Sequence, residues 1–160
     1  MAPVRELVDT WASLYANSAA LRSALSFAHL GGLVGGGGCA IAADLGALRA
    51  LTHGPDAMRT EMHRVHVVHR VVITGLIIVI ASGVCLMLAD VDAFLESPVF
   101  WIKMALVAAL IGNGAMLLKA TQRAERGEHI GMPAMRFGSV LSLALWFLTT
   151  LLGAVLPNVL

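Results

Sequence analysis

Charged residues are scarce in this sequence of 160 residues. Aspartate, glutamate, lysine and arginine make up 13% of the chain, against about 25% in an ordinary soluble domain, while 58% is hydrophobic and the mean hydropathy is +0.82. This composition indicates that lipid rather than water is the solvent. The formal net charge of +1 provides no basic field, so nucleic acid is not expected as a partner.

Cysteines are few and the common catalytic motifs are absent. Cys39 and Cys85 lie inside apolar runs and are interpreted as packing residues rather than a disulfide. No nucleophile–base pair, phosphate loop or paired-carboxylate motif occurs, so hydrolase and nucleotide chemistry are not expected. The N-terminus lacks the pattern of a cleaved signal peptide, because Glu6 and Asp9 offset Arg5.

Four apolar segments are each long enough for a helix that crosses about 30 Å of hydrocarbon. They cover residues 21–48, 65–89, 98–118 and 137–156. Ser97 and Pro98 predict a sharp start for the third segment, with Ser97 as its N-cap. We therefore expect an all-α integral membrane protein, a four-helix bundle that forms one membrane domain over residues 1–160.

Residues 1–17 follow a different pattern. Apolar residues recur at helical spacing while Arg5, Glu6 and Asp9 fall on other faces. The pattern predicts an amphipathic helix at the membrane interface, with Trp11 and Tyr15 as aromatic anchors. A helix that docks on a partner chain is the alternative interpretation.

The connections differ in charge. All charged residues of the second connection are acidic. The first and third connections, with their flanks, contain basic residues: Arg49, Arg59, Arg64, Arg70, Lys119, Arg123, Arg126 and Arg136. By the positive-inside rule the first and third connections are cytoplasmic. Both termini are then expected outside.

Polar groups inside the spans are the candidate functional residues, because burying them in lipid is costly. His29 precedes a glycine run, and helical spacing puts Leu25, Gly32, Gly36, Cys39 and Ala43 on its face. One interpretation is a ligand beside a flat macrocycle. The other is close helix packing, with His29 hydrogen-bonded to a neighbouring hydroxyl.

His66 and His69 form the second candidate, one turn apart on one face. Imidazole binds haem iron, copper or zinc, so the pair predicts a metal site. Together with His53 and His63 it would form a copper or zinc site at the cytoplasmic face. The alternative is that these histidines lie at headgroup level.

Asp44 is predicted at about the depth of His66, where it would either orient that imidazole by a hydrogen bond while the ring binds the metal, or pair with Arg64 or Arg70. Lys103 is interpreted as an outward-pointing, snorkelling lysine, and Asn113 as a hydrogen-bonding group between helices. Met104 is a candidate axial ligand at the depth of His29.

Hairpin geometry sets which histidines can act together. If the first two segments turn near Gly54-Pro55, His66 matches Asp44 in depth and His29 matches residues 81–83. His29 and His66 are then about 22 Å apart along the axis, too far to share one haem. We therefore predict an outer site with His29 and either Met104 or a second chain, and an inner site with His66 or His69.

Several short motifs resemble those of small bacterial four-helix membrane proteins over roughly residues 21–157. They are Ala28-His29 before the glycine run, Ala43-Asp44-Leu45-Gly46, Ala81-Ser82-Gly83, Ser97-Pro98-Val99-Phe100-Trp101, Gly112-Asn113 and Leu141-Ser142-Leu143-Ala144-Leu145-Trp146. In layout these proteins are similar to the copper-resistance D and cytochrome b561-like groups. The resemblance implies a bacterial inner (plasma) membrane protein with a b-type haem or copper.

In b561-like bundles, histidines from several helices pair across the bundle to hold haem. The last two segments here contain no histidine, so a bis-histidine haem has to use the first two segments or two copies of the chain. The first functional hypothesis is a haem b protein that exchanges electrons with quinone or another redox protein. The second is a non-catalytic membrane subunit that packs against partners or a second copy through its first segment.

Overall fold

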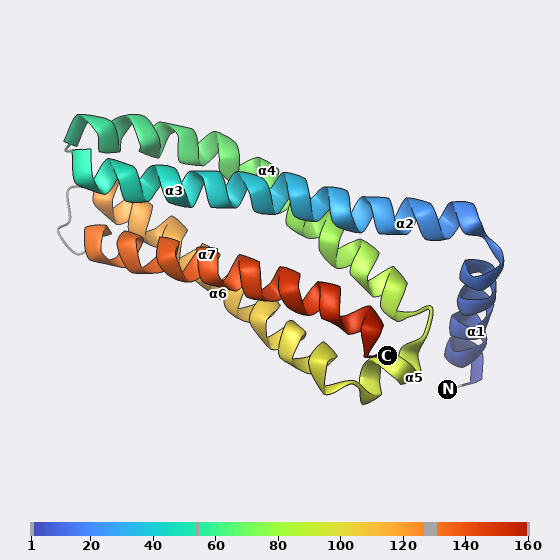
Figure 1. The fold of residues 1–160 in the computed structure, drawn as a ribbon. Helices are drawn as coiled ribbons and strands as arrows, with labels where there is room; N and C mark the ends of the chain where they lie inside the picture. Colours follow the sequence, from blue (N-terminus) through green and yellow to red (C-terminus); the bar gives the residue numbers. More distant parts are fainter. Residues whose placement is uncertain (1, 54, 127–130, 160) are drawn as a thin grey trace.

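The described residues form helices and no strands in this computed structural model (Figure 1). The structure describes residues 2–53, 55–126 and 131–159, and side chains for 4–53, 68–123, 126 and 132–159. The elements are α1 (Ala2–Asn17), α2 (Ala19–Gly32), the π-helical turn η1 (Leu33–Gly37), α3 (Gly38–His53), α4 (Pro55–Met87), α5 (Val91–Glu96), α6 (Pro98–Glu125), α7 (Gly131–Val155) and the 3-10 turn η2 (Leu156–Asn158).

Among the described residues, four stretches of helix are long and apolar enough to cross a membrane, in agreement with the four predicted spans. They are Ala19–His53, Val68–Met87, Pro98–Arg123 and Met132–Asn158. The helices differ from the predicted limits, since the first extends to His53 rather than 48 and the second begins at Pro55 rather than 65. Hydropathy marks the part of a helix that suits lipid, whereas backbone hydrogen bonds continue until a turn breaks them.

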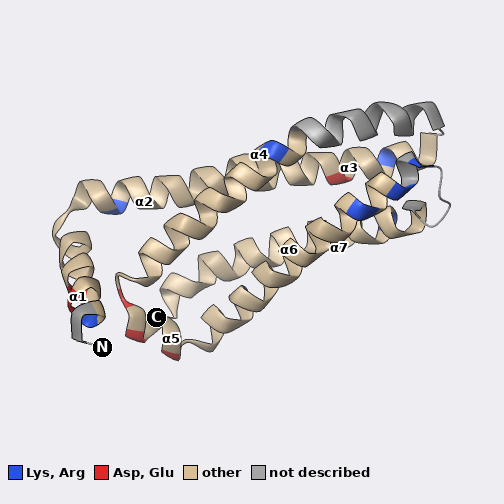
Figure 2. Cartoon of the chain, turned by 180° about the vertical axis from the view of Figure 1, so that it is seen from behind, with Lys and Arg blue, Asp and Glu red and all other residues tan. Residues whose placement is uncertain are grey.

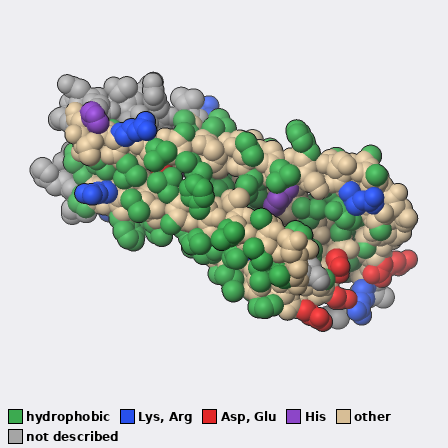
Figure 3. All heavy atoms as spheres, viewed as in Figure 1, with side chains coloured by type: hydrophobic (Ala, Val, Ile, Leu, Met, Phe, Trp, Pro, Cys, Tyr) green, Lys and Arg blue, Asp and Glu red, His purple; other side chains and the backbone are tan. Residues whose placement is uncertain are grey.

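Hydrophobic side chains are spread over much of the face shown in Figure 3. Phe27 and Phe147 are 77% and 67% exposed, and many other large apolar side chains face outward. Soluble monomers rarely expose contiguous apolar surface on this scale. The surface therefore fits contact with a lipid bilayer, as the composition predicts.

The helices pair as two antiparallel hairpins (Figure 1). In the first, α2, η1 and α3 form one continuous rod that packs along α4; in the second, α6 packs along α7. The hairpins meet chiefly where α3 packs on α7. A cluster of Ala40, Leu110, Leu145 and Trp146 lies at that contact.

The two ends of the molecule differ in charge (Figure 2). Lysine and arginine gather at the end where α3 leads to α4 and α6 to α7, which we call the basic end. The acidic residues of α1 and α5 lie at the opposite, acidic end. There the Trp11 indole of α1 donates a hydrogen bond of 2.9 Å to the carbonyl of Cys85, which ties α1 to the end of α4.

The start of α6 agrees only in part with its prediction. The helix begins at Pro98, as expected. Ser97 occupies the predicted N-cap position with an extended backbone, but its buried hydroxyl has no hydrogen-bond partner among the described residues and so makes no capping bond. Pro98 alone favours a helix start, because its missing N–H would be unsatisfied at that position anyway.

Glycines allow the first hairpin to pack backbone against backbone. A Cβ atom on Gly75 would lie 2.5 Å from the Gly36 Cα, and one on Gly36 would lie 3.0 Å from the Gly75 Cα. Gly37 meets the other hairpin, since its Cβ would lie 3.0 Å from the ring of Trp146. Neither contact leaves space for a side chain.

The π-helical turn changes which face of the rod is buried. The sequence predicts one face that continues from Gly32 and Gly36 through Cys39 and Ala43. The structure instead buries Ala40, Asp44 and Ala47 beyond the turn, while Cys39 and Ala43 are only partly buried. A π turn holds one extra residue, which rotates the following helix by about 100°, and so the prediction of a single continuous face is wrong.

Gly75→Ala should destabilise the protein by about 1–3 kcal/mol, because the added methyl group overlaps the backbone of Gly36. Thermal unfolding of the detergent-solubilised protein, followed by circular dichroism, measures the change. Gly35→Ala is the matched control, since nothing lies within 4 Å of its Cβ position. It should keep or slightly raise stability, as alanine favours helix. A Gly75→Ala variant as stable as the wild type would contradict the close approach.

Candidate functional site

One candidate site lies in the half of the molecule toward the acidic end, and we call it the histidine cluster (His29, Ser82 and Lys103). His29 of α2 and Ser82 of α4 are joined by a hydrogen bond of 3.0 Å between Nδ1 and Oγ. The Ser82 hydroxyl already donates its hydrogen to the carbonyl of Ile78, at 2.6 Å. With its single hydrogen on the Ile78 carbonyl, the hydroxyl accepts the bond from the imidazole, which then carries its hydrogen on Nδ1.

This bond sets the tautomer of a neutral His29. With the hydrogen on Nδ1, the Nε2 atom keeps a lone pair that can accept a hydrogen bond or bind a metal. Gly83 packs against the same ring, since a Cβ there would lie 3.3 Å from the His29 Cε1. The bond also confirms the predicted hairpin register, in which His29 lies level with residues 81–83.

Lys103 contributes to the cluster from the second hairpin, which the sequence did not predict. Its Nζ would lie 3.3 Å from a Cβ on Gly153 of α7, and its ammonium is near enough to His29 to interact with it electrostatically. The side chain therefore points between the helices rather than outward. Among the described side chains it has no acidic partner.

The second candidate site is the aspartate cluster (Asp44, Ser139 and Ser142), toward the basic end. Asp44 is 7% exposed, and its carboxyl group forms hydrogen bonds with the hydroxyls of Ser139 and Ser142 on α7. These serines are 1% and 5% exposed. The sequence predicted His66 or an arginine as the partner of Asp44 and missed the two serines, although their spacing of three residues puts them on one face of α7.

The glycines predicted to lie beside a macrocycle are used for packing. A Cβ on Gly32 would lie 2.9 Å from the Gly75 carbonyl oxygen, and Gly36 is in backbone contact with Gly75. Helix α4 thus fills this face. His29 bonded to a hydroxyl above packed glycines matches the packing interpretation of the sequence.

The structure does not join the other predicted ligands to these clusters. The side chains of His63 and His66 lie outside the described residues, and His69 is partly buried on α4. Met104 is 36% exposed on α6, next to Lys103. Within the described part of the chain no three His, Cys, Asp or Glu side chains form a metal-binding group.

Asn113 behaves as the sequence predicts. Its Nδ2 donates a hydrogen bond of 2.9 Å to the carbonyl of Gly138, which links α6 to α7. Its Oδ1 and the Thr149 hydroxyl are buried without a partner among the described residues. The Asn113 bond thus holds the second hairpin together, next to Ser139 of the aspartate cluster.

Comparison with known protein families, curated proteins and solved structures finds no match for this chain. The resemblance to the copper-resistance D and cytochrome b561-like groups therefore stays a prediction. The functional argument depends on the two clusters themselves.

Ser139→Ala should destabilise the protein by about 1–3 kcal/mol, because it removes a donor from a buried carboxyl group. The cost should shrink when Asp44 is already alanine, and a double-mutant cycle of unfolding free energies measures this coupling. Thr150→Ala is the control on the same helix, since that exposed hydroxyl bonds only to the Trp146 carbonyl of its own helix. Equal costs of Ser139→Ala in both backgrounds would show that Ser139 and Asp44 do not interact.

Proposed function

We propose that this chain is a membrane electron-transfer protein that binds one b-type haem at the histidine cluster. The observation that carries the proposal is the bond between His29 Nδ1 and Ser82, which leaves Nε2 as the free ring nitrogen. Ligating histidines usually donate their other N–H to a nearby acceptor, which orients the ring. When bound, the haem would supply one-electron redox chemistry.

Lys103 supports the proposal from the opposite hairpin. An ammonium group within a membrane span needs an anion nearby, and the described side chains offer it none. The propionate carboxylates of haem are anions of the required kind. His29 would then hold the iron while Lys103 pairs with a propionate.

The second axial ligand would be Met104 of α6, which is 36% exposed and next to Lys103 in the sequence, or a group from another copy of the chain. Helices α6 and α7 contain no histidine that could serve instead. Quinone or another redox protein is the proposed electron partner.

The full-length protein, purified in detergent from cells supplied with haem, should show a Soret band. His29→Ala should abolish it, and Ser82→Ala should weaken haem affinity by about 10- to 100-fold, as loss of a hydrogen bond to a ligand usually does. His53→Ala is the control, because His53 is exposed and bonds to Thr52 and to the Arg49 carbonyl at the end of α3. Absorbance titration with haemin measures all three.

Two results would contradict the haem proposal. A colourless protein that does not bind added haemin would leave the histidine cluster as a packing contact and favour the non-catalytic subunit. A Soret band that remains in a folded His29→Ala variant would indicate that the haem binds at another site, such as the predicted pair His66 and His69. Circular dichroism of each variant verifies that it is folded.

We further propose that the basic end faces the cytoplasm of a bacterial inner membrane. The asymmetry of charge between the two ends supports this orientation (Figure 2). Helix α1, with Trp11 and Tyr15, then lies at the outer interface. The four spans and α1 together form the proposed bundle with its interfacial helix.

Fusions with topology reporters test this orientation. A reporter after Leu160 or within residues 91–95 should be active only outside, and one near Glu128 only inside. Alkaline phosphatase and green fluorescent protein fusions read the two compartments separately. A cytoplasmic C-terminus would reverse the proposed orientation.

A further inference from the structure

Three helices bury a layer of polar side chains between two apolar layers. Each apolar layer takes side chains from α3, α6 and α7. One is the cluster of Ala40, Leu110, Leu145 and Trp146, and the other, toward the basic end, consists of Ala47, Ala50, Ala120 and Met135. Between them along the three helices are the buried polar residues Asp44, Asn113, Ser139 and Ser142. We call these residues the polar layer, and all of them lie within the membrane-spanning stretches.

The polar layer has more hydrogen-bond acceptors than donors. The hydroxyls of Ser139 and Ser142 bond to the Asp44 carboxyl group, and each has a single hydrogen to donate. The Asn113 side chain is 5% exposed, and its Nδ2 donates to the carbonyl of Gly138, one residue before Ser139. Its Oδ1 is buried and has no partner among the described residues. A buried acceptor without a partner is costly, so this oxygen indicates a ligand that the described side chains do not supply.

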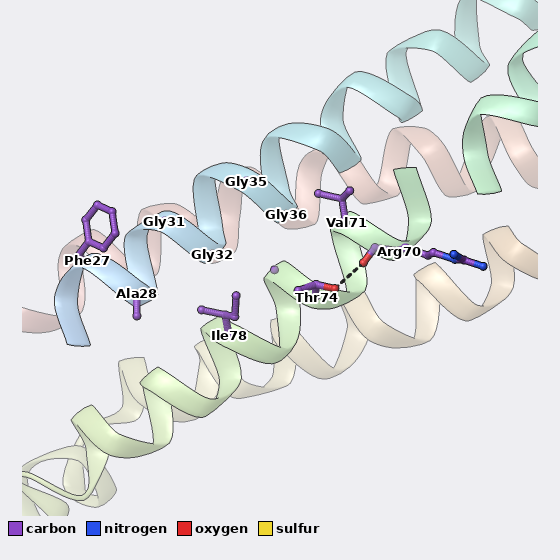
Figure 4. A pocket seen from close by; sticks show the side chains of 11 residues that line it. Phe27, Ala28, Gly31, Gly32, Gly35, Gly36, Arg70, Val71, Thr74 and Ile78 are labelled. Atoms are coloured by element: carbon purple, nitrogen blue, oxygen red, sulfur yellow. Dashed lines mark hydrogen bonds between the residues drawn. The ribbon is translucent and has the colours of Figure 1, made fainter. Parts of the chain in front are cut away.

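Among the described side chains, no cation balances the charge of Asp44. The members of the polar layer on α6 and α7 are uncharged, and the nearest basic side chains on α3, α6 and α7 are exposed, namely Arg49, Lys119 and Arg136. On α4, His69 and Arg70 are the titratable groups near this level, and neither pairs with Asp44. Arg70 lines a groove on the outside of the first hairpin, and its guanidinium extends away from the apolar stretch of that groove (Figure 4). Because a carboxylate without a cation is costly within a membrane span, Asp44 holds either a proton or a cation.

We propose that the polar layer binds one Na⁺ ion, with the side-chain oxygens of Asp44, Asn113, Ser139 and Ser142 as its ligands. Carboxylate, amide and hydroxyl oxygens suit hard cations, in contrast to the imidazole and thiolate ligands of transition metals. The single carboxylate neutralises a monovalent cation, whereas a divalent cation would leave a positive charge inside the membrane. A serine hydroxyl can donate its hydrogen to the carboxylate while its oxygen faces the ion.

Binding exchanges a proton for the ion. Without Na⁺, Asp44 keeps its proton as a carboxylic acid; with Na⁺ bound, the O–H bond has broken, the proton has passed to water and the carboxylate holds the ion. The polar layer then carries no net charge in either state. The few side-chain oxygens favour Na⁺ over K⁺, because K⁺ sites are built from rings of backbone carbonyls.

Thermal unfolding of the full-length protein in detergent, in choline chloride that is replaced stepwise by NaCl or KCl at constant ionic strength, tests the proposal. NaCl at about 100 times its Kd should raise the folding equilibrium constant about 100-fold, because only the folded chain binds the ion. KCl should have little effect. In weakly buffered solution with a pH dye, NaCl should release about one proton per chain, and the apparent Na⁺ affinity should rise by up to about tenfold per pH unit because the proton competes.

Asp44→Asn should abolish both the stabilisation by Na⁺ and the proton release, since it keeps the size of the side chain and removes its charge. Asn113→Leu should weaken Na⁺ binding about tenfold or more, because it removes the Oδ1 ligand. If Asn113→Leu does not fold, Ser142→Ala replaces it and removes one ligand oxygen. Asp92→Asn on α5 is the matched control, since that carboxyl group is exposed and lies outside the polar layer. It should leave the response to Na⁺ unchanged.

Three results would overturn the Na⁺ site. Stability that responds to pH but not to NaCl would show that Asp44 binds only a proton. An equal response to NaCl and KCl would show a general effect of salt. A response to NaCl that remains in a folded Asp44→Asn variant would place the ion elsewhere in the protein. Circular dichroism of each variant verifies that it is folded.

Discussion

The backbone contact between Gly36 and Gly75 is the constraint on which the rest of the structure depends. A side chain at either position would separate α4 from the rod of α2, η1 and α3. Lipid provides no hydrophobic force between helices, so close packing and hydrogen bonds have to hold them together. The next residue, Gly37, receives the ring of Trp146 from α7. Two adjacent glycines of the rod therefore contact different helices, Gly36 contacting α4 and Gly37 contacting α7.

The π-helical turn Leu33–Gly37 lies at the same level of the rod. The turn rotates α3 relative to α2, so that His29 faces α4 while Asp44 faces α7. Each polar cluster then joins both hairpins, since Lys103 approaches His29 and two serines bind Asp44. The glycine run thereby decides where the polar groups of the membrane spans meet.

Sequence patterns within single helices and turns predicted the features that depend on local sequence. The four spans, the start of α6 at Pro98, the hairpin register that sets His29 beside Ser82 and the interhelical role of Asn113 all follow from hydropathy and turn chemistry. The sequence did not predict that Lys103 would approach His29 or that Asp44 would interact with two serines, because in each case the two partners belong to different hairpins. Helical periodicity also cannot reveal a one-residue insertion, and for that reason the buried face beyond Gly36 was assigned wrongly.

The two clusters differ in how far their polar groups are satisfied within the chain, and this difference underlies the proposal of a ligand at the histidine cluster. Asp44 and His29 are fifteen residues apart, about 22 Å along the helix, so the carboxyl group cannot neutralise Lys103. Asp44 is instead satisfied locally by two hydroxyl donors. Lys103, which is partly buried, has no such local acceptor among the described residues, and it acts electrostatically on His29. A cation within a membrane span without an anion is costly. The hydrogen bonds of Asp44 are therefore made within the chain, whereas the charge of Lys103 is left without a counter-charge among the described side chains.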